Sequence, residues 1–389
     1  MVAITASTLF TPLERIDHPI VVIEGGLITG IQTRDGFANP TNARVIDLCD
    51  AILSPGFIDM HIHGAGGYDV MSPSDTGLAA MESVLAQHGS TSYFPTTVTA
   101  PMDITLSALD RLADEIEACE KRSPDHVRAQ PVGIHIEGPF LSHERRGVHP
   151  PENLVRPSIT VFDRLWQAAR GHIKIMTIAP EVDGALEVIG EAAKRGVVVS
   201  MGHSDATLEQ AQKGMGAGAR HATHTFNAMR PLNHREPGIL GLVLTEPSIT
   251  ADIILDGIHV DPVIARLFLQ MKGHERSVLI SDGLSATGMA DGDYRLGALD
   301  VHVEDGRCLA GNTLAGSVLT LDRAVRNAMH FGKIEARHAL SAATLNPATI
   351  TGIASSTGKL APGVQADIVV MNSKYEIMRT IIQGRGIEA

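Results

Sequence analysis

Histidine and carboxylate side chains recur directly after apolar runs of the sequence, a pattern that can hold a metal ion. The first run ends in His61 and His63. Residues two apart in a β-strand point to the same side, so both imidazoles could face one ion. Four later apolar runs end in residues of the same types, namely His135 with Glu137, His203, His221 with His224, and Asp282.

Each of these features is weak alone, because the chain has 18 histidines and an aspartate after a strand more often caps a helix. Their repetition at successive strand ends favours one shared site. Imidazole and carboxylate without cysteine suit zinc, iron or a related divalent ion in a hydrolytic site. A bound ion would activate water, and Asp282 is the expected base that takes the proton from that water and returns it to a leaving amine.

Alternation of apolar runs with amphipathic stretches predicts the elements that position these groups. The clearest amphipathic stretches are residues 107–121, 183–195 and 207–217, and such alternation is typical of βα units around a parallel sheet. We therefore expect an α/β fold, a (β/α)₈ TIM barrel. A doubly wound open sheet is the alternative, but no GxGxxG turn supports it. The eight predicted strands are residues 53–63, 91–97, 131–137, 173–178, 197–203, 221–224, 251–255 and 278–282.

Both ends of the chain consist of short predicted strands separated by Gly, Asp and Pro. The expected strands are residues 2–4, 20–24, 27–32 and 43–47 at the beginning, and 366–371 and 378–383 at the end. We expect the two ends to pair into one small β-sandwich domain, with the termini close together. The predicted domains are 1–54 and 355–389 for the small β domain and 55–354 for the barrel.

Composition excludes some partners. The formal net charge of −12 over 389 residues argues against nucleic acid as the main partner. We see no signal peptide and no apolar stretch long enough to span a bilayer, which predicts a cytoplasmic protein without a membrane partner. Cys49, Cys119 and Cys308 form no CxxC pair, and we expect them to be idle thiols rather than a disulfide or metal site.

Residues 55–64, PGFIDMHIHG, resemble the opening signature of the amidohydrolase superfamily. Most two-metal members use a carbamylated lysine on a later strand, whereas here the matching position is Glu137. This departure resembles the N-acetylglucosamine-6-phosphate deacetylase family, as do APE at 179–181, GHSDAT at 202–207, ATHTFNAM at 222–229 and REPG at 235–238. The resemblance covers nearly the whole chain. It implies hydrolysis of the acetamide of N-acetylglucosamine 6-phosphate, in amino-sugar catabolism and cell-wall sugar recycling.

The same resemblance implies roles for the candidate residues. Glu137, His203 and His224 match the ligands of the principal metal, for which zinc is favoured, with iron, manganese or cobalt as alternatives. Asp282 matches the catalytic acid and base. His149 matches a residue beside the acetyl carbonyl, where a donor would stabilise an oxyanion.

Further matches concern the phosphosugar. Asn227 and Ala228 fall where backbone amides hold the phosphate. Arg235 matches an arginine that reaches the phosphate from the neighbouring subunit, which implies a homodimer. The remaining substrate contacts implied by the resemblance are Val148, His149, Asp256, His259, Leu314, Ala315 and Gly316.

Some alternatives stay open. Some family members carry amides in place of His61 and His63 and hold one metal. This chain keeps both histidines, so a second ion bound by His61, His63, Glu137 and Asp282 is favoured over a vacant site. His135 is expected beside the ligands, and His221 is expected to be structural. The rival functions are another amidohydrolase such as an adenine deaminase or cyclic-amide hydrolase, a non-catalytic scaffold, and a sugar-phosphate-binding regulator.

Overall fold

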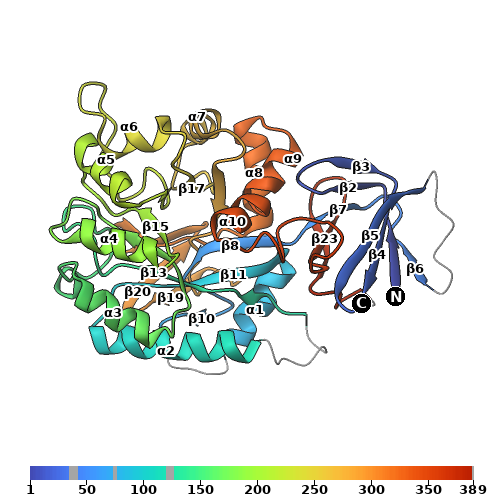
Figure 1. Ribbon diagram of the computed structural model, residues 1–389, viewed down its shortest axis with the longest axis horizontal. Helices are drawn as coiled ribbons and strands as arrows, with labels where there is room; N and C mark the ends of the chain where they lie inside the picture. Colours follow the sequence, from blue (N-terminus) through green and yellow to red (C-terminus); the bar gives the residue numbers. More distant parts are fainter. Residues whose placement is uncertain (35–42, 73–76, 120–126, 388–389) are drawn as a thin grey trace.

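The computed structural model describes residues 1–34, 43–72, 77–119 and 127–387, and it is a mixed α/β structure. A curled parallel sheet with helices around it forms the larger part, and smaller sheets made from both chain ends lie to one side (Figure 1). Within the part of the chain described, no helix has the length and apolar character needed to cross a bilayer.

All eight strands expected from the sequence are present, six of them in one parallel sheet and two in a separate parallel pair. Six pair in the order β8 (Phe57–Ile62), β11 (Ser90–Thr97), β13 (Ile134–Glu137), β14 (Ile173–Ile178), β15 (Val198–Met201) and β16 (His221–Ala222). Strands β17 (Ala251–Ile254) and β18 (Ser277–Ile280) pair with each other. Thr225 N–H donates to Asp252 O at 2.9 Å and Asp282 N–H donates to His61 O at 2.9 Å. These two bonds connect the β17–β18 pair to both ends of the six-stranded row.

Ten α-helices in the described residues pack around this sheet, which explains why its strands are nearly uniformly buried. Thr207 and Gln210 form a capping box at the start of α5, and Asp261 caps α7. The helices are α1 (Leu78–Gln87), α2 (Met102–Cys119), α3 (Ile159–Ala168), α4 (Ala185–Lys194), α5 (Leu208–Ala217), α6 (Gly238–Thr245), α7 (Pro262–Lys272), α8 (Leu321–Gly332), α9 (Ala336–Ala342) and α10 (Leu345–Ile350). The predicted helices at 107–121, 183–195 and 207–217 are confirmed, although α2 begins at Met102 and residues 120–121 lie outside the described residues.

The two chain ends pair, as expected. One sheet has the order β5 (Leu27–Thr33), β4 (Pro19–Glu24), β1 (Val2–Thr5), β6 (Arg44–Asp47). The other has the order β24 (Ile377–Ile381), β23 (Ile368–Met371), β7 (Ile52–Pro55), β2 (Thr8–Phe10), β3 (Arg15–Asp17). Both sheets contribute to one buried apolar cluster that includes Ile4, Val21, Leu53 and Val370. The two termini lie in this same part of the molecule (Figure 1).

Several predicted strand limits were wrong. The run 53–63 is two strands, β7 in the small sheet and β8 in the parallel sheet, and they separate at Gly56. A Cβ at Gly56 would lie 2.1 Å from Thr91 Oγ1, so the chain passes too close to its neighbour for a larger residue. The run 131–137 likewise divides into β12 (Gln130–Pro131) and β13. The strands expected to contain His203, His224 and Asp282 all end before these residues.

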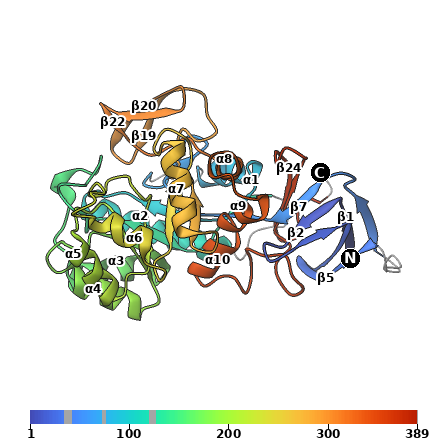
Figure 2. The same cartoon turned by 90° about the horizontal axis from the view of Figure 1, so that it is seen from above.

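The sequence interpretation did not include a four-stranded antiparallel sheet. It consists of β19 (Gly292–Leu296), β20 (Leu299–Glu304), β21 (Arg307–Ala310) and β22 (Thr313–Leu314). Figure 2 shows it as an orange layer on one side of the molecule. Its buried face, which includes Leu296, Val301 and Val303, packs on Leu284 and neighbours. A short pair, β9 (Gly64–Ala65) and β10 (Tyr68–Asp69), follows β8.

Candidate metal centre

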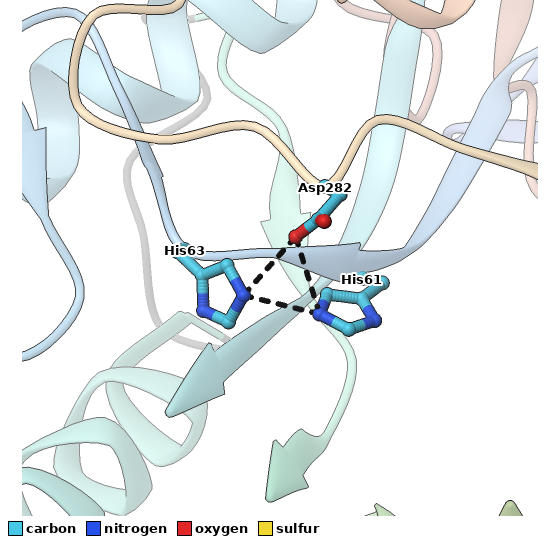
Figure 3. A group of neighbouring side chains, drawn as sticks. All are labelled: His61, His63 and Asp282. Atoms are coloured by element: carbon cyan, nitrogen blue, oxygen red, sulfur yellow. Dashed lines mark hydrogen bonds and ion pairs between the residues drawn. The ribbon is translucent and has the colours of Figure 1, made fainter. Parts of the chain in front are cut away.

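Two clusters of imidazole and carboxylate groups meet beyond the carboxyl ends of the parallel strands. The first cluster is Glu137, His203 and His224: Glu137 Oε1 lies 3.1 Å from His203 Nε2 and 3.0 Å from His224 Nε2. The two Nε2 atoms are 3.0 Å apart. The second cluster is His61, His63 and Asp282 (Figure 3). There His61 Nε2 lies 3.1 Å from His63 Nε2, and Asp282 Oδ1 lies 3.4 and 3.2 Å from these nitrogens.

Glu137 joins the two clusters. Its Oε1 is 3.5 Å from His61 Nε2 and its Oε2 is 3.3 Å from His63 Nε2. All six side chains are buried. The structure therefore brings together residues that are separated by more than 200 positions in the sequence, as the sequence analysis predicted.

Backbone conformation differs among the residues of the two clusters. His61 lies in β8 and His63 directly follows it, so strand alternation turns both to the same side (Figure 3). His203, His224 and Asp282 instead have φ values of 47°, 31° and 49°, in the left-handed region. This conformation costs a residue other than glycine about 1–2 kcal/mol, so the surrounding structure must hold it. For His224, the Asp252 carboxylate does so by accepting a hydrogen bond from the His224 N–H.

Hydrogen bonds at Nδ1 fix the position of one ring hydrogen in His63 and His203. His63 Nδ1 lies 3.0 Å from Thr96 O, and His203 Nδ1 lies 3.0 Å from Arg145 O. A carbonyl oxygen can only accept, so both Nδ1 atoms carry a hydrogen. In the neutral ring the Nε2 lone pair then faces a carboxylate, an arrangement that requires a cation or a further proton between them.

His149 has the opposite arrangement. Its Nδ1 accepts from the Thr99 N–H at 3.3 Å and lies 2.9 Å from Thr99 Oγ1. Its Nε2, 3.4 Å from Glu137 Oε2, therefore carries the hydrogen. Although His149 is near enough to be a metal ligand, this tautomer makes it a hydrogen-bond donor.

The charges of the centre favour a cation. Burial opposes charge on His63, but Asp282 and Glu137 outweigh it and raise the pKa of His63 to about 10. In the same way, the pKa of His224 rises to about 9 against the effect of burial, mainly through Glu137. The pKa values of Glu137 and Asp282 lie well below their usual range despite burial, chiefly because of His61 and its neighbours. The negative field that holds these protons also favours a divalent ion.

A cavity of about 450 Å³ opens over the two clusters. It brings together most of the residues expected to contact substrate, namely Val148, His149, Asn227, Ala228, His259, Leu314, Ala315 and Gly316. Asp256 does not line the cavity, but its Oδ2 lies 2.7 Å from His259 Nδ1 and so orients that ring. Arg235 is exposed and lies outside the cavity of its own chain.

The two remaining candidate histidines support the site. His135 packs edge-on against His61 at 4.6 Å between ring centroids, and its nitrogens contact Met60 O and Thr177 Oγ1. His221 Nε2 lies 3.0 Å from Asp252 Oδ2, the carboxylate that also holds His224. His221 thus supports the carboxylate that holds His224, and it does not line the cavity.

The sequence analysis missed Asp205, which joins three segments of the site. Its Oδ1 accepts from Arg145 Nε at 2.7 Å, and Arg145 O is the carbonyl that orients His203. Its Oδ2 accepts from Arg230 Nη2 at 2.7 Å, two residues after Ala228. Asp205 lies within the GHSDAT segment at 202–207, but the sequence analysis gave it no role, because only the fold brings its two arginines together.

Comparisons with known proteins agree with this geometry. The Amidohydrolase family model matches residues 52–387. N-acetylglucosamine-6-phosphate deacetylase of Lysinibacillus sphaericus is 38% identical over 86% of this chain and 84% of its own length. N-acetylgalactosamine-6-phosphate deacetylase of Escherichia coli O157:H7 is 35% identical over 95% of this chain and 94% of its own. The crystal structure of N-acetyl-D-glucosamine-6-phosphate deacetylase from Mycobacterium smegmatis superposes with a TM-score of 0.91 at 33% identity, covering 99% of each chain.

Proposed function

Because this chain belongs to the amidohydrolase family, we propose that it hydrolyses the acetamide of N-acetyl-D-glucosamine 6-phosphate, releasing D-glucosamine 6-phosphate and acetate. One observation carries this proposal: Glu137, His203, His224 and Asp282 all line one cavity. The identity to curated deacetylases over most of the chain supports the choice of substrate.

The proposed architecture is a closed (β/α)₈ TIM barrel, residues 55–354, with a small β-sandwich domain from residues 1–54 and 355–389. The backbone bonds that connect β17 and β18 to both ends of the strand row support closure. The apolar cluster common to both small sheets supports the sandwich.

The donor atoms fit a divalent ion. The first cluster would hold the principal ion through Glu137, His203 and His224, and the second cluster would hold another through His61, His63, Glu137 and Asp282. Imidazole nitrogens and carboxylate oxygens without sulfur favour zinc, with iron, manganese or cobalt as alternatives. A bound ion supplies a water of lowered pKa and polarises the acyl carbonyl.

The chain's own groups supply the proton transfers. Asp282, whose low pKa keeps it ionised, takes a proton from the attacking water as the water oxygen bonds to the acyl carbon. The C–N bond then breaks, and Asp282 returns that proton to the leaving amine. His149 Nε2–H donates to the acyl oxygen while negative charge develops there. The products are the free amino sugar phosphate and acetate.

The phosphate would lie at Asn227 and Ala228, where Ala228 has a left-handed backbone with φ 48°. Arg235 would reach the phosphate of a neighbouring subunit in a homodimer. Arg235 is exposed and lies outside the cavity of its own chain, which is consistent with a contact to the cavity of a second copy. An arginine can grip phosphate with two hydrogen bonds.

Acetate release tests the proposal. The purified protein should release acetate from N-acetylglucosamine 6-phosphate more than about a hundredfold faster, in kcat/KM, than from the unphosphorylated sugar, because ionic hydrogen bonds to phosphate are lost. Equal rates on both sugars would refute the phosphate site. No release from either would refute the deacetylase.

N-acetylgalactosamine 6-phosphate is a second candidate substrate, because one relative at 35% identity is named for that sugar. The two epimers differ only at one hydroxyl of the ring. Measuring kcat/KM for both phosphosugars in parallel decides which one the cavity prefers.

Arg235→Ala tests the homodimer. Loss of an ionic contact to phosphate should raise KM roughly tenfold or more with a smaller change in kcat. Light scattering should show a dimer before and after the substitution. A monomeric wild-type protein, or an unchanged KM, would contradict the shared site.

A further inference from the structure

We call the cavity of about 450 Å³ over the two clusters the main cavity. Three apolar side chains line it beside His149. Val98 and Leu296 are buried, with 8% and 3% of their surfaces exposed, and Val148 is half-buried. They come from three separate segments: the end of β11, the loop before His149, and the end of β19. We call these three residues the acyl wall.

A second, smaller cavity lies against the same wall. Its volume is about 30 Å³, and it shares Val98, Val148, His149 and Leu296 with the main cavity. Thr99, Pro101, Ala298 and Leu299 are among the residues that complete it. This space accommodates roughly one methyl-sized group.

We propose that the acyl wall and the second cavity form the subsite that selects the acyl group of the amide. The inference rests on the proposed amide hydrolysis. Thr99 N–H occupies Nδ1 of His149, so Nε2 carries the hydrogen, and in the proposed reaction this Nε2–H donates to the acyl oxygen. The acyl chain and the acyl oxygen are bonded to the same carbon, so the chain also lies near His149.

The polarity of the cavity lining determines which way the acyl chain points. On the metal side of the reacting carbon, the cavity is lined by His63, Glu137 and Asp282. The acyl wall offers apolar surface next to His149, and burial of a methyl group there is favourable. The acetyl methyl therefore packs on the wall, with the second cavity beyond it.

This arrangement predicts a graded acyl preference. A propionyl group adds one methylene, which the second cavity accepts when Leu296 or Val148 shifts. We expect kcat/KM for the N-propionyl phosphosugar within about tenfold of that for the N-acetyl compound. A butyryl group exceeds the space, and its kcat/KM should fall more than about a hundredfold.

Ala298→Leu is the sharpest variant. Ala298 lines the second cavity and not the main one, and it is exposed in the turn between β19 and β20, so a leucine fills the space with little effect on folding. We expect the propionyl-to-acetyl ratio of kcat/KM to fall at least tenfold. Leu296→Ala opens the wall and should raise the propionyl-to-acetyl ratio.

Leu314→Ala is the matched control, because Leu314 lines the main cavity but not the second one. It should change both substrates by the same factor. Normal acetate release, with acyl ratios unaffected by Ala298→Leu and Leu296→Ala, would overturn the subsite alone. Wild-type protein that cleaves the acetyl but not the propionyl compound would also overturn it. Absence of acetate release would overturn the deacetylase, and the subsite with it.

Discussion

The two clusters of the metal centre share Glu137 but are built in different ways. In the second cluster, His61 and His63 stand on a single strand and its immediate end, so strand geometry alone sets their separation. In the first cluster, His203 and His224 follow different strands in left-handed backbone, and distant groups hold them. A local motif can therefore place one pair of imidazoles, whereas the other pair depends on the whole fold.

Their connections to the cavity also differ. Asp205 binds Arg145, whose carbonyl oxygen orients His203. It also binds Arg230, which lies beside the proposed phosphate site. In each cluster one ring is anchored at Nδ1, while Nδ1 of His61 and of His224 has no partner among the described residues. We infer that the first cluster couples ion binding to substrate binding, and that the second cluster acts more independently.

Glu137→Gln should have the largest effect, because this side chain belongs to both clusters. A neutral amide cannot balance two ions, so both should be lost, and kcat should fall by more than about ten-thousandfold. Metal analysis of the purified variant by mass spectrometry, with the activity assay, checks this. Retention of one ion per chain would show that the clusters do not share Glu137.

Asp282→Asn should separate ion binding from proton transfer. The amide keeps the shape of the side chain but cannot accept the water proton, so kcat should fall about a thousandfold. The ion of the first cluster should remain, since His203, His224 and Glu137 are intact. Unchanged turnover would remove Asp282 as the base.

His61→Asn should affect the second cluster alone. We expect the metal content to fall by about one ion per chain and kcat to fall roughly tenfold, in the range seen when one member of a metal site is weakened. Loss of both ions would contradict the independence of the clusters.

Asp205→Asn should have the smallest effect and tests the coupling of the first cluster. Both arginines lose a charged partner, so kcat/KM should fall by about three- to tenfold, with metal content unchanged. Asp163→Asn is the control, because Asp163 pairs with Arg195 at 2.6 Å on the outer face of the helices, outside the cavity. Equal effects of the two substitutions would show that Asp205 contributes only to general stability.

The sequence predicted most of the parallel sheet, because its strands are buried runs bounded by turn residues. It also predicted that His61 and His63 turn to the same side, since their spacing matches strand alternation. The same reasoning extended the strands through His203, His224 and Asp282, where the backbone turns left-handed. The alternation of apolar and polar residues does not indicate where the backbone becomes left-handed, because contacts with neighbouring segments impose that conformation.

The antiparallel sheet β19–β22 was missed although a signal was present. Residues 299–304, LDVHVE, alternate apolar and polar, and Asp305-Gly306 follows with φ values of 49° and 76°. An Asp-Gly pair between alternating segments is typical of a β-hairpin. Asp205 lies within the quoted segment at 202–207 and Thr99 within none, but the roles of both arise from contacts that only the fold creates.

The left-handed backbone at His203, His224 and Asp282 has a consequence for engineering. Glycine would adopt these angles freely and could relieve about 1–2 kcal/mol at each position. A screen for thermal stability alone would therefore select glycine at these positions. The selected variants would be more stable but inactive. Selection for thermal tolerance of this protein must be paired with selection for turnover.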